Sequence, residues 1–280
     1  MFAKISYTWA LMRASWDVLK KDKTLLLFPL LSGICCLMVL LSFAVPMFIT
    51  GAWHPPARGA SQVDVTVYYG ILFLFYLANF FVITFFNTAI ISCAMLRMAG
   101  GNPTVGDGFR EAAARLPQIA GWALLSATVG LILRIIEDRS KWVGKIVAGL
   151  LGMAWTVTSF MVVPIIVAER KGPIGALKGS AEVLRKTWGE QLVGSFSFGM
   201  IFGMLSLPAV AMIVIAIILG NIWMLMLSIG LAIGYLIVLS LVQSALQSIF
   251  QAAVYLYAYN NGIAPEGFDS DLLAGALHAK

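Results

Sequence analysis

The sequence has few charged residues for its length. They make up 11% of the 280 positions, whereas 60% of the positions are hydrophobic. An average soluble domain carries roughly 25% charged residues. A water-soluble fold could not enclose so much apolar surface and still present a wettable exterior. This scarcity of charge predicts an integral membrane protein, with lipid rather than water around most of the chain.

Cysteine and histidine are also scarce, and they are scattered. Cys35, Cys36 and Cys93 all lie inside apolar runs, where a free cysteine behaves as a small hydrophobic residue. The two histidines, His54 and His278, lie in polar segments far apart in the sequence. We therefore expect no disulfide framework, no metal site and no cofactor.

Catalytic and nucleotide-binding motifs are missing as well. The chain has no Walker loop, no dinucleotide-binding fingerprint and no His-Glu-x-x-His sequence, and acidic residues are nearly absent from the middle of its apolar runs. Intramembrane proteolysis and proton-coupled transport both depend on ionisable side chains at depth. These absences predict a protein that is not an enzyme.

Long apolar runs, by contrast, are plentiful. About 20 residues of helix cross a hydrocarbon core of roughly 30 Å, and helix is the default because backbone groups in lipid must be satisfied within the segment. Six runs cover approximately residues 25–49, 67–98, 119–136, 146–168, 192–219 and 223–257. The mixed polarity before the first run does not resemble a cleavable signal peptide. The sequence therefore predicts an all-α fold with six transmembrane helices.

Lysine and arginine are unevenly divided between the two sides of these runs. Fourteen fall on one side and five on the other, and both termini lie on the richer side. Because Lys and Arg accumulate on the cytoplasmic side of membranes, we expect both termini to be cytoplasmic. The net charge of +6 then reflects topology, and we expect no nucleic-acid partner.

An apolar stripe at helical spacing precedes each pair of predicted spans. The stripes are Ile5, Trp9, Met12, Trp16 and Leu19; Val105, Phe109, Ala112 and Leu116; and Ile174, Leu177, Ala181, Leu184 and Trp188. Thr104 and Asp107 form a capping-box pattern, and Pro173 suits a first helical turn. The basic residues expected at the membrane surface are Arg13, Lys20, Lys21, Lys178, Arg185 and Lys186. These segments either lie on an anionic leaflet or brace the cytoplasmic end of the bundle.

The first and third segments resemble copies of each other. Ser15-Trp16-Asp17-Val18-Leu19-Lys20-Lys21 echoes Ser180-Ala181-Glu182-Val183-Leu184-Arg185-Lys186. Each segment also has an acid four residues before a base, and the pairs are Asp17–Lys21, Glu111–Arg115 and Glu182–Lys186. We infer a threefold pseudo-repeat of cytoplasmic amphipathic helix, span, span within one membrane domain. Its units are residues 1–99, 100–168 and 169–260, followed by a cytoplasmic tail at 261–280.

Polar residues inside the predicted spans gather on two of them. In the last span, glutamines and serines form two neighbouring helical lines, and the second span carries two asparagines. These candidates are Ser240, Gln243, Ser244, Gln247, Ser248, Gln251, Asn79 and Asn87. Amides face lipid only at a cost, so they either line a hydrated pathway or bond neighbouring helices or subunits.

Small residues and one charge cluster complete the candidate sites. Small residues recur every four positions in three spans, which allows close helix approach. The rows are Gly144, Ala148 and Gly152; Ser195, Gly199 and Gly203; and Gly230 and Gly234. Arg134 lies near the outer boundary beside Glu137 and Asp138. This cluster is either a local ion pair or an ion-attracting ring in an oligomer.

Several stretches resemble a known family. They are Phe86-Asn87 through Gly100, Pro103-Thr104-Val105-Gly106-Asp107-Gly108, Trp122 through Gly130, Lys186 through Gln191, and Ala253 through Ala258. Together they are similar to an uncharacterised family of bacterial multi-span inner-membrane proteins, filed as a domain of unknown function. The resemblance implies a bacterial inner membrane but no activity and no functional residue.

Two classes of function remain open at this point. The leading hypothesis is a homo-oligomeric pore or solute pathway lined by the amides and hydroxyls of the last and second spans. The alternative is a structural or lipid-organising module that binds anionic lipids through its basic amphipathic helices, or an accessory subunit of another membrane protein.

Overall fold

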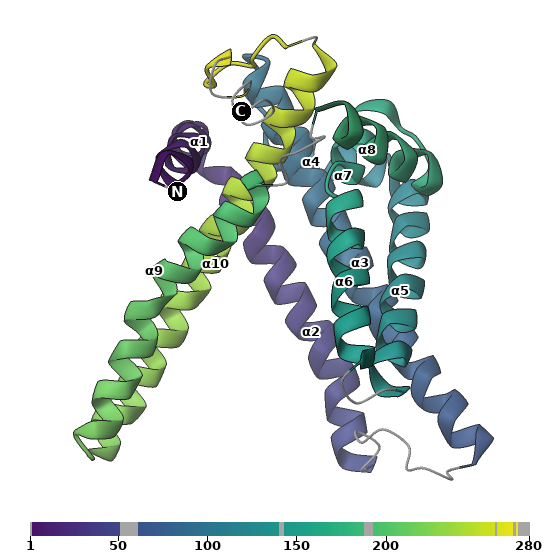
Figure 1. Ribbon diagram of the computed structural model, residues 1–280, viewed down its shortest axis with the longest axis vertical. Coiled ribbons are helices and arrows are strands. Elements are labelled where there is room, and N and C mark those ends of the chain that lie inside the picture. Colours follow the sequence, from purple (N-terminus) through teal and green to yellow (C-terminus); the bar gives the residue numbers. More distant parts are fainter. Residues whose placement is uncertain are drawn as a thin grey trace. The chain divides into compact units, whose positions relative to one another are not determined.

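The computed structural model describes residues 2–50, 61–139, 143–187, 193–260, 262–270 and 273, without the side chains of 2–8, 50, 139, 186–187 and 193–198. All regular structure in these ranges is helical (Figure 1), which confirms the all-α class. The helices are α1 (Phe2–Lys21), the 3-10 helix η1 (Lys23–Leu26), α2 (Leu27–Thr50), α3 (Gln62–Met98), α4 (Val105–Ala113), α5 (Leu116–Arg139), α6 (Val143–Thr158), α7 (Val162–Glu169), α8 (Pro173–Thr187), α9 (Val193–Ile218) and α10 (Ile222–Tyr259).

Six segments are long and apolar enough to cross a membrane, which confirms the number expected from the sequence. They are Lys23–Ile49, Gln62–Met98, Leu116–Asp138, Val143–Glu169, Gly199–Ile218 and Ile222–Tyr259. The second and sixth have 37 and 38 residues. At 1.5 Å per residue, each is roughly 25 Å longer than a hydrocarbon core of about 30 Å. These two helices must tilt or continue beyond the membrane.

Residue contacts divide the chain into two compact units. Unit 1 contains Met1–Pro29, Ala94–Asn102 and Thr187–Lys280, and unit 2 contains Leu30–Cys93 and Pro103–Lys186. This division concerns contacts in space and does not test the threefold repeat, which stays a prediction.

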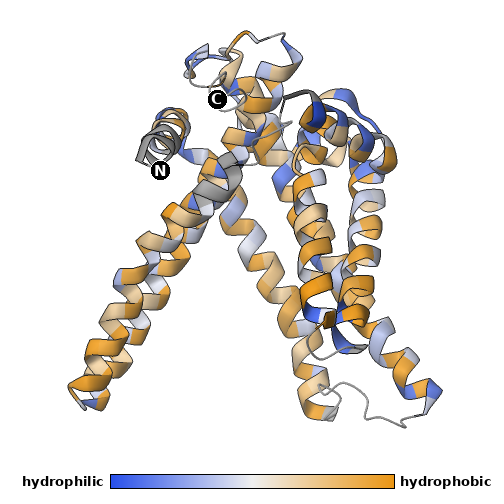
Figure 2. Cartoon of the chain, viewed as in Figure 1, coloured by the Kyte–Doolittle hydropathy of each residue, from blue (hydrophilic) through white to orange (hydrophobic). Residues whose placement is uncertain are grey.

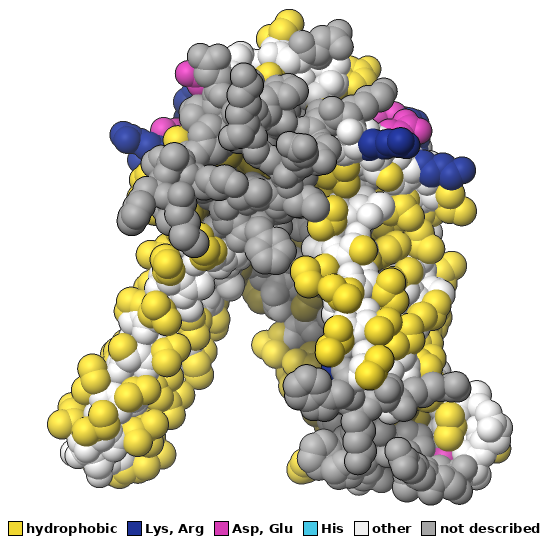
Figure 3. Space-filling view, in the orientation of Figure 1, with side chains coloured by type: hydrophobic (Ala, Val, Ile, Leu, Met, Phe, Trp, Pro, Cys, Tyr) yellow, Lys and Arg dark blue, Asp and Glu magenta, His cyan; other side chains and the backbone are white. Residues whose placement is uncertain are grey.

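Unit 1 is built on a hairpin of α9 and α10 (Figure 1). Gly220, with a φ of +66°, forms the turn, and the Asn221 side chain caps α10 by accepting a hydrogen bond from the Trp223 N–H at 2.9 Å. Hydrophobic residues follow both helices along their length (Figure 2), and they cover the hairpin surface seen in Figure 3. Apolar side chains exposed in this way are expected where lipid is the solvent.

The end of α1 is tied to the segment that follows α10. Lys21 Nζ lies 3.1 Å from Glu266 Oε1, and the Glu266 N–H donates to the Met98 carbonyl at 3.2 Å. The expected Asp17–Lys21 pair is therefore wrong, because Lys21 reaches Glu266 while Asp17 lies 3.6 Å from Lys20.

Unit 2 contains α5 and α6 packed side by side. The indole rings of Trp122 and Trp155 stack between them, with centroids 5.4 Å apart and planes within 8°. At the start of α4, the Thr104 hydroxyl accepts from the Asp107 N–H, and the Asp107 carboxylate accepts from the Thr104 N–H at 2.9 Å. This reciprocal pair confirms the capping box.

The fourth span, which the sequence predicts as one apolar run over approximately 146–168, is interrupted. α6 ends at Thr158 and α7 begins at Val162, with Pro164 in the first turn of α7. The break leaves the Met161 N–H without a helical acceptor, and the Ser180 hydroxyl of α8 accepts it at 3.0 Å. A side chain from another helix thus satisfies the interrupted backbone.

The buried face of α8 differs in part from the apolar stripe that the sequence spacing predicts. Ala176 and Ser180 are completely buried, and Leu184 of the predicted stripe is buried as well, whereas Ile174 and Ala181 are exposed. Small residues face inward because α8 packs closely on α7: a Cβ at Gly179 would lie 3.2 Å from Ile165. The start of α8 at Pro173 is confirmed, while Trp188 and the Lys186 side chain lie outside the described residues.

Candidate functional site

The first amphipathic helix buries a different face from the one its apolar spacing indicates. Leu11, Ser15 and Val18 form the centre of the buried face of α1, while Trp9 and Trp16 are 56% and 39% exposed. Of the remaining predicted stripe, Met12 and Leu19 are buried, and the Ile5 side chain lies outside the described residues. The two indoles are therefore free for a role other than packing the inner side of α1.

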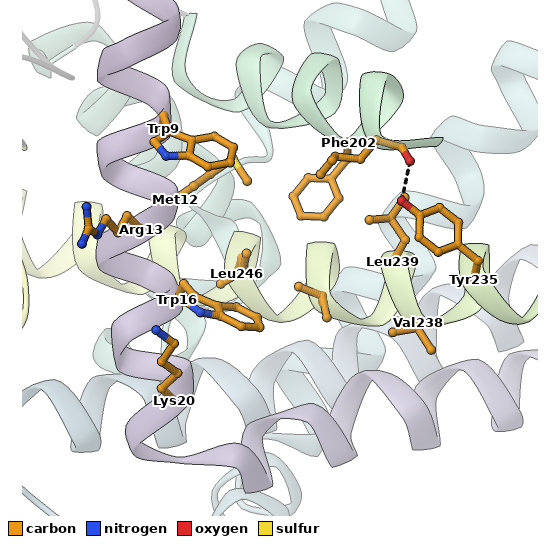
Figure 4. A pocket seen from close by; sticks show the side chains of 12 residues that line it. Trp9, Met12, Arg13, Trp16, Lys20, Phe202, Tyr235, Val238, Leu239 and Leu246 are labelled. Atoms are coloured by element: carbon orange, nitrogen blue, oxygen red, sulfur yellow. Dashed lines mark hydrogen bonds between the residues drawn. The ribbon is translucent and has the colours of Figure 1, made fainter. Parts of the chain in front are cut away.

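Both indoles line a cavity of about 580 Å³ between α1, α9 and α10, all within unit 1. Figure 4 shows the rings of Trp9 and Trp16 pointing from α1 toward the other two helices. The lining residues are Trp9, Met12, Arg13, Trp16 and Lys20 of α1; Phe202 and Leu205 of α9; and Tyr235, Val238, Leu239, Val242 and Leu246 of α10. We call this cavity the α1 pocket.

The charged groups of the α1 pocket are all on one wall. Arg13 and Lys20 both come from α1, and no described lining residue is acidic. Lys20 Nζ lies 5.8 Å from the centre of the Trp16 ring and 3.6 Å from the exposed carboxylate of Asp17. Such an exposed pair is worth little, so the Lys20 ammonium remains open to another anion.

The α9 and α10 walls are apolar, and their one polar side chain is occupied. Tyr235 Oη donates a hydrogen bond to the Leu205 carbonyl at 2.6 Å. Pro208 interrupts the backbone bonding of α9 at this level, because proline has no N–H to donate. The tyrosine therefore joins the two helices and leaves the inner part of the pocket without a free donor.

The amide line of α10 lies next to this pocket but does not face into it. Gln243, Gln247 and Gln251 are half-buried, and none of them makes a hydrogen bond with another described residue. Among the serines of the neighbouring line, Ser248 is buried and donates to the Ser244 carbonyl at 3.0 Å, and Ser240 donates to the Ile237 carbonyl at 2.8 Å. The hydroxyls of Ser240 and Ser248 thus bond within α10, while the three amides make no hydrogen bond with a described residue.

The asparagines of α3 belong to unit 2, whereas the glutamines of α10 belong to unit 1. Asn79 donates to the Phe75 carbonyl of its own helix at 2.9 Å. Asn87 is half-buried and makes no hydrogen bond with another described residue. Their part in a shared polar pathway stays a prediction.

Only one row of small residues lies in a packed environment. Gly144 is buried, Ala148 is half-buried, and a Cβ at Gly152 would lie 3.8 Å from Leu133 of α5. In unit 1, a Cβ on any glycine of the other rows, Gly199, Gly203, Gly230 and Gly234, would meet nothing within 4 Å. Ser195 lies outside the residues with described side chains. A packing role for the unit 1 rows stays a prediction.

The charge cluster at the end of α5 forms local ion pairs. Arg134 lies 3.3 Å from Glu137 and 3.4 Å from Asp138, one helical turn away. The arginine also lines a cavity of about 350 Å³ with Tyr76 and Lys145.

The buried arginine of unit 2 was missed as a site by sequence reasoning. Arg115 Nε donates to the carbonyls of Ile166 and Val167, at 3.2 and 3.0 Å, and the guanidinium pairs with Glu111. It therefore satisfies the C-terminal carbonyls of α7, where a cation also complements the helix dipole. The expected Glu111–Arg115 pair is confirmed, but the sequence contains no signal for the contact with α7.

A protein-family model, described as a family of unknown function, matches residues 66–264. The chain belongs to DUF6159. The match includes the α9 and α10 walls of the α1 pocket, while α1 itself lies before the matched region. No curated protein matches this DUF6159 chain. Within the described residues, no three His, Cys, Asp or Glu side chains come together as metal ligands.

Proposed function

We propose that the protein is a non-enzymatic, multi-pass protein of a bacterial inner membrane that binds and organises anionic lipids of the cytoplasmic leaflet. Both termini and the amphipathic helices α1, α4 and α8 are on the cytoplasmic side in this proposal. The excess of Lys and Arg on that side of the spans supports the orientation. The family assignment and the six apolar helices support membrane residence.

The exposed indoles and cations of α1 carry this proposal. Trp9 and Trp16 are largely uncovered, and Arg13 and Lys20 share their helix. Indole rings favour the headgroup region of a bilayer, and basic residues close to an anionic surface each contribute roughly 1 kcal/mol of attraction. Burial of α1 on α9 and α10 positions these groups beside a membrane span rather than on a free peptide.

α8 presents a similar combination on its outer face. Ile174 is largely exposed, and Lys178 and Arg185 are exposed along the same helix. Since Ser180 and Ala176 hold the opposite face inside unit 2, α8 cannot turn its basic residues inward without losing that packing.

The test is lipid selection by the full chain in reconstituted vesicles. Energy transfer from tryptophan to a labelled phosphatidylglycerol should exceed transfer to an equally labelled phosphatidylcholine. Salt should reduce the difference, because exposed charges are screened over a Debye length of about 8–10 Å at physiological ionic strength. Equal transfer to both probes at low salt would contradict the proposal.

A matched pair of variants on α8 sharpens this measurement. Lys178→Gln with Arg185→Gln removes positive charge and should weaken the preference for phosphatidylglycerol. Glu182→Gln, on the same helix and also exposed, removes negative charge and should preserve or strengthen it.

An oligomeric pore is the second candidate, and the unbonded amides of Gln243, Gln247 and Gln251 favour it. In lipid such amides need water or another subunit as a partner. The pore ranks second because these glutamines lie too far along α10 to line the middle of a bilayer. Gln243 lies about 32 Å from Ile222 along α10, where a core of about 30 Å that starts at the hairpin turn would already end.

Solute flux distinguishes the two candidates. A pore predicts ion or small-solute flux above that of empty liposomes, and this flux should fall when Gln243 and Gln247 are both changed to Leu. Background flux under voltage, tension and pH changes, together with retained lipid selection, would leave only the lipid-organising function.

A further inference from the structure

The α1 pocket has the size and lining of a site for an elongated apolar ligand. Its volume of about 580 Å³ lies within the range of roughly 300–1,000 Å³ typical of small-molecule sites. Val238, Leu239 and Val242 supply apolar surface from α10, and Phe202 supplies it from α9. A site lined in this way gains its affinity mainly by burial of hydrocarbon.

The pocket runs along α10 from the hydrocarbon toward the membrane surface. Tyr235 lies about 20 Å from the start of α10 and Leu246 about 36 Å from it, at 1.5 Å per residue. In a core of about 30 Å that begins at the hairpin turn, the Tyr235 end is within hydrocarbon and the Leu246 end is at the interface. Figure 4 shows Leu246 beside Trp16 of α1 and Tyr235 at the other end.

Charge is present only at the interfacial end. Lys20 and Arg13 stand there with the two indoles, and no described acidic residue lines the pocket. Lys20 has an exposed carboxylate, Asp17, as its only ion-pair partner among the described residues, and Arg13 has none. A ligand with a hydrocarbon tail and an anionic head would match both ends at once.

We propose that the α1 pocket binds one anionic phospholipid, with an acyl chain against α9 and α10 and the phosphate beside Lys20. This inference rests on the proposed function only in placing α1 at the surface of a bilayer. It goes further because it assigns a single site with a fixed lipid, whereas surface attraction requires no site. Tyr235, held by Leu205, closes the inner end of the pocket.

Native mass spectrometry of the full chain in detergent tests the site. We expect one phosphatidylglycerol retained per chain. Phosphatidylcholine should bind about tenfold more weakly, because it has the same phosphate but its choline cation repels the Lys20 ammonium. Lys20→Gln should remove this preference without abolishing binding of either lipid. Leu239→Trp should fill the pocket and reduce the binding of both.

Two controls separate the site from general effects. Lys145→Gln removes an exposed lysine from α6, and Val214→Trp adds the same bulk on an exposed part of α9 outside the pocket. Both should bind phosphatidylglycerol as the unaltered chain does. Equal losses in these controls, or no loss in Lys20→Gln and Leu239→Trp, would overturn the proposal.

A second measurement does not depend on the folding of a bulky variant. Phosphatidylglycerol brominated on its acyl chain should quench tryptophan fluorescence. The fraction of the fluorescence that is quenched should be larger in the unaltered chain than in the Trp9→Phe/Trp16→Phe variant. Equal fractional quenching, or a chain that dimerises through this face without bound lipid, would refute the site. If the vesicles show salt-sensitive lipid selection but mass spectrometry finds no retained lipid, the lipid site in the α1 pocket is refuted and the proposed function is not. If lipid is retained but the vesicles show no salt-sensitive selection, the proposed function is refuted and the lipid site is not.

Discussion

The helices α1 and α8 have echoing sequences, but their buried serines lie in different surroundings. Ser15 and Ser180 occupy matching positions, and both are completely buried. The Ser180 hydroxyl accepts a hydrogen bond from the Met161 N–H, whereas Ser15 Oγ has no hydrogen-bond partner among the described residues. The two similar sequences therefore bury a serine at the same position, but only the serine of α8 has a hydrogen-bond partner.

The helices against which α1 and α8 pack explain this difference. α8 lies against the interruption between α6 and α7, where a backbone N–H has lost its helical acceptor. α1 lies against α9 and α10, which continue as helices and use their own N–H groups. The serine of one motif can thus accept a hydrogen bond from a backbone N–H at a helix break, while the serine of the similar motif packs against continuous helices that have no free N–H.

Arg115 gives the largest expected effect among the side chains that bond to the backbone of another helix. Arg115→Met should lower the free energy of unfolding by about 3 kcal/mol, because it leaves α7 carbonyls unsatisfied and Glu111 without its cation. Thermal unfolding followed by circular dichroism in detergent measures this loss. Arg110→Gln, at an exposed position on α4, is the control, and an equal effect from both variants would contradict the role given to Arg115.

The serine of α8 should have the next largest effect. Ser180→Ala removes the acceptor for the buried Met161 N–H and should cost about 1–2 kcal/mol in the free energy of unfolding. Hydrogen exchange at the Met161 N–H should quicken in this variant more than exchange within α7. Unchanged exchange at Met161 would mean that the hydrogen bond contributes nothing.

The serine of α1 should behave in the opposite way. Ser15→Ala removes a buried hydroxyl that has no partner, so it should be neutral or stabilise the fold by up to about 1 kcal/mol. Thermal unfolding of this variant beside Ser180→Ala compares the two helices directly. Similar destabilisation by both would show that the two serines are equivalent after all.

The third amphipathic helix, α4, offers a smaller effect that depends on pH. Hydrogen bonds from the Thr104 hydroxyl and N–H lower the pKa of Asp107 below its ordinary value of about 3.9. Because this pKa is lower in the folded chain, the stabilisation is complete above the ordinary value and is lost as the pH falls through the lowered one.

Measurement of thermal midpoints between acidic and neutral pH tests this cap. The difference between the unaltered chain and Asp107→Asn should be constant near neutrality and should narrow in acid. A difference that stays the same down to the lowest pH would mean that ionisation of Asp107 does not contribute.

Composition and local pattern were sufficient for the elements of the fold. A 60% hydrophobic chain with six long runs has few stable arrangements other than a set of apolar helices, so the number of spans followed directly. The capping box at Thr104 and the helix start at Pro173 were also predictable, because each depends on residues only a few positions apart.

Long-range packing was needed for everything that defines the candidate site. Periodicity groups Trp9 with Met12 and Trp16, but it cannot tell which side of α1 meets α9 and α10, since both sides carry apolar residues. Likewise, Arg115 and Ser180 are ordinary helix residues until the end of α7 and the break before it supply their partners. Those partners lie 52 and 19 residues away in the chain, so no local rule relates them to the side chains they bind.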